Sequence, residues 1–179
     1  AALNSAKLRY EEGTPFEHVS DVLQNYLKKY PNSTSYTEIN ELVVSSFIHQ
    51  QDYQGALDYL KKKKSQENSA LTFEVSLYRG IQLFNEQKFQ KSLPFFTTAK
   101  IANDSEISQK ASYWEAETLY RLENYSEALA KFKSTKKILD SSNKNEFSLI
   151  DYNIGYTHFK LKEYDKAITF LNRFTNATI

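Results

Sequence analysis

Residues 111–128 read Ala111-Ser-Tyr-Trp-Glu-Ala-Glu-Thr-Leu-Tyr-Arg-Leu-Glu-Asn-Tyr-Ser-Glu-Ala128, and this stretch decides the fold. The small residue Ala116 stands nine residues before Tyr125, and a second small residue, Ala128, follows that tyrosine by three. Two antiparallel helices can approach closely only where their side chains are small. The stretch therefore predicts two helices that are joined by a short turn and cross at Ala116 and Ala128.

The aromatic-to-small pattern recurs at a nearly constant period. Its aromatic residues are spaced by 36, 36 and 39 positions, and they are Tyr53, Phe89, Tyr125 and Tyr164. The small residues three positions later are Ala56, Ser92, Ala128 and Ala167. Seven positions after each aromatic comes a large apolar residue, Leu60, Phe96, Phe132 or Leu171, and nine before it stands Val44, Gly80, Ala116 or Gly155. A period of this length predicts a repeat protein built from helical pairs.

A fifth, divergent unit leads the chain. Phe16 stands 37 residues before Tyr53, after a Gly13-Thr14-Pro15 turn. Only 4 Gly and 3 Pro occur in 179 residues, which favours helices over many short strands. Ten helices are expected, over residues 3–11, 16–29, 35–50, 53–64, 69–86, 89–102, 106–122, 125–138, 145–161 and 164–176. We expect Asp104-Ser105 to start one helix and Ser141-Ser142-Asn143 to form a connection.

The composition excludes several classes of function. The net charge is +1, so no strong field attracts nucleic acid or an anionic membrane. No apolar run is as long as a membrane span, and there are no cysteines. The three histidines, His18, His49 and His158, have no metal-ligand spacing and are interpreted as surface or packing residues. No catalytic residue, metal site or cofactor is therefore predicted.

The repeated positions resemble the tetratricopeptide repeat family over nearly the whole chain. The resemblance implies an all-α, right-handed α-α superhelix of about five helix–turn–helix repeats. We expect one solenoid domain over 1–179, with repeats near 1–33, 37–70, 73–106, 109–142 and 148–179. Tyr113-Trp-Glu-Ala-Glu117 and Tyr30-Pro31-Asn32-Ser33 resemble the variety found in bacterial cell-envelope repeat proteins. That resemblance favours a bacterial periplasm or cell envelope over the cytoplasm.

Two units depart from the family pattern ten positions before the turn aromatic. The family usually has leucine there, and this chain has Arg79 and Glu115 in two of its units. A charge at a normally buried position predicts that these helices are rotated from the standard packing frame.

The resemblance places a concave surface on the first helix of each pair. Its residues stand twelve, eight, five and four positions before each turn aromatic. In the last three units the candidate partner-binding residues are Leu77, Ile81, Phe84, Tyr113, Glu117, Tyr120, Arg121, Tyr152, Tyr156, Phe159 and Lys160. Several aromatic side chains on one face are typical of a peptide groove, with the charged members fixing polar ends. The alternative is that the aromatics pack between repeats or against a further helix. The family's carboxylate clamp is absent, because Glu41, Leu77, Tyr113 and Tyr152 stand where its first lysine would be.

The predicted function is a non-catalytic scaffold that binds a protein or peptide on this aromatic face. Two alternatives stay open: a self-associating or spacer module, which includes a homo-oligomer, and the regulatory repeat domain of a longer enzyme. Neither nucleic acid nor direct membrane insertion is expected. The start at Ala1 without Met and the end at Ile179 predict a piece of a longer protein.

Overall fold

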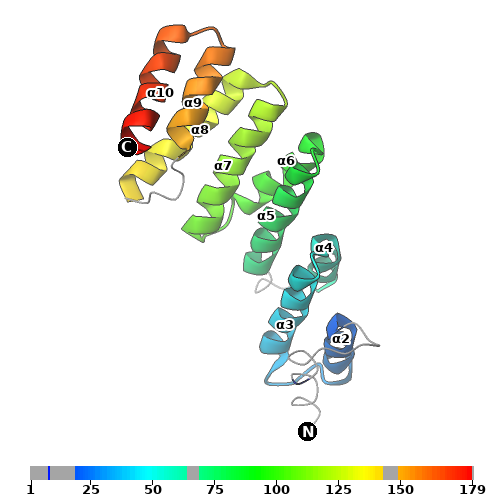
Figure 1. Ribbon diagram of the computed structural model, residues 1–179. Coiled ribbons are helices and arrows are strands. Elements are labelled where there is room, and N and C mark those ends of the chain that lie inside the picture. The colour runs from blue at the N-terminus through cyan, green and yellow to red at the C-terminus, as the bar shows by residue number, and fades with distance from the viewer. Residues whose placement is uncertain (1–7, 9–18, 64–68, 143–148, 179) are drawn as a thin grey trace. The chain divides into compact units, whose positions relative to one another are not determined.

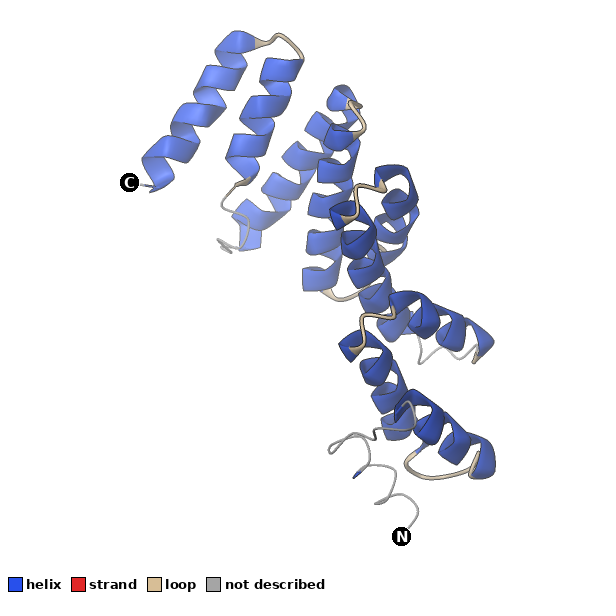
Figure 2. Ribbon diagram, turned by 45° about the vertical axis from the view of Figure 1, so that its right-hand side comes forward, coloured by secondary structure: helices blue, strands red, loops and turns tan. Residues whose placement is uncertain are grey.

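The computed structural model describes residue 8 and residues 19–63, 69–142 and 149–178, and the secondary structure of this part is helical with no strand (Figure 1). Its helices are α2 (Val19–Lys29), α3 (Tyr36–His49), α4 (Tyr53–Lys62), α5 (Ser69–Asn85), α6 (Phe89–Ala99), α7 (Ser105–Arg121), α8 (Tyr125–Ser142), α9 (Ile150–Lys160) and α10 (Tyr164–Thr178). Short loops join the two helices of a pair (Figure 2). The all-α repeat prediction is confirmed.

Two compact units make up the chain, residues 1–75 and 76–179. In the first, α2, α3, α4 and the start of α5 share one core, which includes Leu23, Val43, Leu60 and Val75. Inside it the Tyr59 hydroxyl donates to Asn40 Oδ1 at 2.7 Å, which satisfies a buried amide. In the second, the cores lie between α5, α6 and α7 and between α7, α8 and α9.

The predicted helices agree with the observed ones within a few residues, except at two places. Helix α8 continues to Ser142, so the prediction of a connection at Ser141-Ser142 is wrong. No glycine or proline interrupts residues 125–142, and helix propensity therefore carries the helix onward. Helix α9 begins at Ile150, and the predicted start at 145 lies outside the described residues. Of the predicted helix over 3–11, the structure describes only residue 8, which is helical.

A left-handed residue ends the first helix of each pair, two positions before the turn aromatic. These residues are Gln51, Gln87, Glu123 and Lys162, with φ between 56° and 62°. At the third of these turns, the Asn124 N–H donates to the Leu119 carbonyl at 2.9 Å and the Glu123 N–H to the Tyr120 carbonyl at 3.0 Å. This pair of bonds satisfies two carbonyls at the helix end and reverses the chain.

The predicted helix start at Asp104 is confirmed. Its Oδ1 accepts hydrogen bonds from the N–H groups of Glu106 at 2.7 Å and Ile107 at 3.2 Å. These two donors are among the first N–H groups of α7, which have no partner inside the helix. The cap therefore fixes the residue at which α7 begins.

The small residues mark the helix crossings, as predicted. A Cβ added at Gly80 would lie 2.6 Å from the Phe96 ring, and one added at Gly155 would lie 2.8 Å from Leu171 Cγ. The small residues on the second helices, Ala56, Ser92, Ala128 and Ala167, are all buried. Close approach at these points accompanies burial of the large apolar residue that follows, which is complete or nearly so at Leu60, Phe96 and Phe132 and partial at Leu171.

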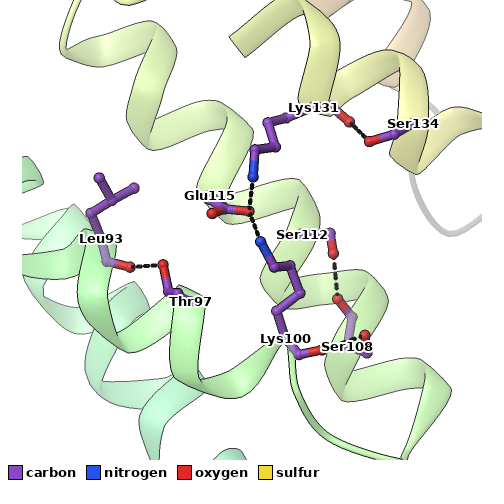
Figure 3. Close-up of polar contacts among 8 residues, drawn as sticks. All are labelled: Leu93, Thr97, Lys100, Ser108, Ser112, Glu115, Lys131 and Ser134. Carbon is purple, nitrogen blue, oxygen red and sulfur yellow. Dashed lines mark hydrogen bonds and ion pairs between the residues drawn. The ribbon is translucent and has the colours of Figure 1, made fainter. Parts of the chain in front are cut away.

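Two lysines form ion pairs with the buried carboxylate of Glu115. Its carboxylate is buried, and Oε2 lies 2.7 Å from Lys100 Nζ and 3.2 Å from Lys131 Nζ (Figure 3). Ala116 and Leu119 remain buried beside it, so the predicted rotation of the helix is wrong at this repeat. Lys100, just after the end of α6, and Lys131 on α8 therefore compensate the buried charge.

Candidate functional site

The three candidate residues on α5 are not an open surface. Leu77 is only 3% exposed and lies in a core cluster with Phe96 and Ala111. Ile81 and Phe84 pack against the same cluster, and the Phe84 and Trp114 rings are 5.1 Å apart. The expectation that Leu77 is exposed is therefore wrong, because the first helix of the next repeat covers this part of α5.

A pocket of about 200 Å³ lies at α7, α8 and α9. Its lining residues are Glu117, Tyr120, Arg121, Phe132, Tyr152, Asn153 and Tyr156. Five of these belong to the candidate set, and the structure brings them together from two consecutive repeats. Two lining residues were not predicted: Phe132, which was expected in the core, and Asn153, which lies one position after Tyr152 on α9.

A polar cluster stands at one side of the pocket. Asn153 Nδ2 donates to the Tyr113 hydroxyl oxygen at 2.8 Å and also to Glu117 Oε1. The Tyr113 hydroxyl lies 3.4 Å from the same carboxylate oxygen. Asn153 therefore ties the carboxylate of one repeat to the first helix of the next.

The cluster shifts two pKa values. Burial raises the pKa of Glu117, and Arg121 and the Tyr113 hydroxyl offset part of that increase. Burial, with the nearby Glu117 charge, raises the pKa of Tyr113 to about 12. Desolvation of the charged form is the larger cause at both groups.

An array of aromatic rings extends from the pocket along α9 and α10. The Tyr152 and Tyr156 ring centroids are 4.6 Å apart, and the Tyr156 and Phe159 centroids are 6.4 Å apart. Phe159 continues to Tyr164 at 5.7 Å. Tyr156 is 41% exposed and Phe159 is 52% exposed, so these rings present apolar area to solvent.

The two remaining basic candidates lie near this array. Arg121 is exposed at the end of α7 and forms no ion pair with any described residue. Lys160 is also exposed, and its Nζ lies 6.0 Å from the centroid of the Tyr125 ring. A cation at that distance from an aromatic face is attracted by the ring quadrupole. Tyr125 therefore orients Lys160 beside the array.

His158 is a packing residue. Its ring is buried and stacks on Phe170 at 5.6 Å, and Nδ1 lies 2.5 Å from Glu163 Oε2. Hydrogen bonds from Lys166 and then from His158 lower the pKa of Glu163. His49 lies in the last turn of α3, and His18 lies outside the described residues.

Among the residues that the structure describes, no group of three or more histidine, aspartate or glutamate side chains has the geometry to hold a metal ion. Over the same part of the chain, no helix combines the length and apolar character needed to cross a membrane.

The model of the tetratricopeptide repeat family matches residues 151–177, which span most of α9 and α10. No curated protein matches the chain in sequence. Solved structures with the same fold include the MamA RS-1 ArsTM double mutant, which is 14% identical with a TM-score of 0.63. The alignment covers 98% of this chain and 91% of that one.

Two further solved structures are similar. MamA 41-end from Desulfovibrio magneticus RS-1 is 16% identical with a TM-score of 0.60, and the alignment covers 98% of this chain and 92% of that one. The nearly identical TPR-like repeats from Podosopora anserina are 9% identical with a TM-score of 0.54, over 98% of this chain and 92% of the other. The last hairpin therefore matches the tetratricopeptide repeat family, and the hairpins before it have the same turn, crossing and spacing.

Proposed function

We propose that the protein is an interaction scaffold that binds a peptide segment of a partner along α7 and α9. The observation that carries this proposal is the pocket between these helices, which opens beside the exposed rings of Tyr152, Tyr156 and Phe159. Aromatic anchors that enter or line pockets supply most of the binding energy at many protein interfaces. Repeat solenoids use the exposed residues of successive units as one continuous binding surface.

The exposure of these rings favours binding over a purely structural role. In the preceding repeat, Tyr113 and Tyr120 are equivalent to Tyr152 and Phe159, and both are partly buried by α8 and α9. Contiguous aromatic exposure carries an unfavourable hydration free energy that a partner would remove. The flanking charges of Arg121 and Lys160 supply a polar rim around the apolar centre.

The test is selection of binders from a random peptide library, followed by calorimetric titration of the selected peptides. Replacing Tyr152 and Tyr156 together by alanine should weaken binding about tenfold or more while the circular dichroism spectrum stays unchanged. Ile101→Ala is the matched control, because Ile101 is an exposed apolar residue outside the pocket. If the double variant bound as the parent does, or lost helicity in step with binding, the aromatic face would not be the site.

Self-association is a second candidate, favoured by a different observation. Tyr164 and Ile168 on α10 are 53% and 57% exposed, whereas Tyr125 and Leu129 at the same repeat positions are partly buried. Another copy could cover these two side chains. Sedimentation velocity at increasing concentration checks this, and Ile168→Lys should abolish a dimer formed there. A monomer at all concentrations would leave peptide binding as the proposed function.

A further inference from the structure

Glu117 is a pocket carboxylate that forms no ion pair with a described basic residue. Its hydrogen bonds come from Asn153 and Tyr113, which are neutral, and it makes no ion pair within the part of the chain that the structure describes. Glu115, two positions earlier on the same helix, is paired with two lysines. A largely buried carboxylate is stabilised best by a directly paired opposite charge. Arg121 lines the same pocket and acts on Glu117 at longer range, so Glu117 lacks the direct pairing that Glu115 has.

Three tyrosines accompany this carboxylate in the pocket. Tyr120 lies on α7, and Tyr152 and Tyr156 lie on α9 with their ring centroids 4.6 Å apart. Aromatic faces attract cations through the ring quadrupole, and the attraction increases when water is excluded. A carboxylate and several tyrosine rings around one cavity therefore complement a basic side chain on an apolar stem.

We propose that the pocket at Glu117 receives the side chain of a lysine or arginine from the bound partner. This proposal rests on the proposed function and assigns the chemistry of one position in the ligand. The aliphatic stem would lie between Tyr120 and Tyr152, and the terminal cation would reach the Glu117 carboxylate. Asn153 positions that carboxylate through its hydrogen bond to Oε1.

An acidic ligand group fits the same pocket less well. Arg121 also lines the pocket and would attract an anion, but the anion would then lie in one small cavity with the Glu117 carboxylate. Arg121 is exposed in the last turn of α7, so its long side chain can turn toward solvent when a cation enters. Arg121 therefore opposes the proposed ligand, and its removal should not weaken binding.

The experiment uses N-acetyl-lysine-N-methylamide as the probe, titrated into the full chain and followed by NMR. The norleucine and glutamate analogues are titrated in parallel, because norleucine keeps the stem and removes the charge. The lysine probe should shift the side-chain amide signals of Asn153, and Glu117→Gln should weaken its binding about tenfold. Glu106→Gln, an exposed position at the start of α7, is the matched control and should bind as the parent does. Arg121→Ala should leave lysine binding equal or stronger.

Two results would overturn the inference: equal binding of norleucine and lysine, or binding of the glutamate analogue that is lost in Arg121→Ala. Failure of the proposed function gives a different outcome. If selected peptides depend on Tyr152 and Tyr156 but tolerate replacement of every basic residue, the face binds peptides and the inference is wrong. If no peptide depends on those tyrosines while the lysine probe still depends on Glu117, the inference holds and the proposed function is wrong.

Discussion

One aromatic pair occupies equivalent positions in two repeats with opposite outcomes. Phe84 and Phe89 lie 5.1 Å apart, and Trp114 from the next repeat packs against Phe84 at 5.1 Å. Phe159 and Tyr164 lie 5.7 Å apart at the same repeat positions, yet each is more than half exposed. The repeat pattern therefore decides where an aromatic residue stands, and the following helix decides whether it becomes core or surface.

The comparison separates two kinds of contact. Packing inside a hairpin recurs along the second unit. The small residues at its crossings, such as Ala128 and Ala167, are buried. Packing between hairpins depends on the neighbour, and it is complete around Phe132 and incomplete around Tyr156. The proposed binding face lies where the second kind of packing is missing.

The largest effect is expected from the apolar residue seven positions after the turn aromatic. Phe132 is fully buried between α7, α8 and α9, so Phe132→Ala should reduce the free energy of unfolding by about 3–5 kcal/mol. Leu171 holds the same position in the last repeat but is only partly buried, and Leu171→Ala should cost less. Urea unfolding of both variants measures the difference, and equal losses would contradict the distinction between covered and open repeats.

Overpacking a crossing should have a smaller effect that is the same in both regions. Ala128 and Ala167 are buried at the crossings of the third and last hairpins of the pattern, so leucine at either should cost about 1–3 kcal/mol. Ala130→Leu, at an exposed position of α8, should be nearly neutral and serves as the control. An unchanged stability of Ala128→Leu would mean that the crossings are assigned incorrectly.

The buried Glu115 carboxylate should contribute less to the free energy of unfolding than the crossings do. Glu115→Gln leaves Lys100 and Lys131 without their shared partner, and both lysines are about one-third exposed and can be hydrated. We expect a loss of about 1–2 kcal/mol in thermal or urea unfolding. Glu106→Gln removes an exposed pair with Lys110 on the same helix and should change stability by less than about 0.5 kcal/mol.

The smallest effect concerns Glu117, which lies between the two regions. Because burial raises its pKa, the folded chain holds this proton to higher pH than the unfolded chain does. Stability from this group is therefore present at acid pH and is lost as pH rises through the raised pKa. Urea unfolding at pH 4 and pH 7 should show a smaller loss in Glu117→Gln than in the parent. The opposite order would contradict the burial of the carboxylate.

Much of the fold could be predicted because the decisive contacts are local in sequence. A turn aromatic and its flanking small residues lie within about 12 positions, as from Ala116 to Ala128. One hairpin can therefore be recognised from a short stretch of sequence. The left-handed turn at Glu123 was not predicted, because glycine is the usual sign of that conformation. Its hydrogen bonds and the packing of the two helices hold a charged residue there.

The candidate site was predicted only in part. The spacing on one helical face identified Glu117, Tyr120, Tyr152 and Tyr156 as neighbours, and the structure places them around one pocket. Asn153 points into the same space from the adjoining position of α9, where a concave-face pattern does not assign a role. The prediction that Leu77 is exposed was wrong, because α7 covers this residue.

The helical pairs, their period, their crossings and the position of each aromatic residue follow from the amino-acid pattern, since these depend on contacts within about 36 residues. Tertiary structure alone decided which of these aromatic residues are exposed and which charges are compensated. Glu115 and Glu117 stand two positions apart on one helix, yet one meets two lysines and the other faces a pocket. Burial and pairing depend on what the neighbouring helices bring to a residue, and no local pattern encodes that.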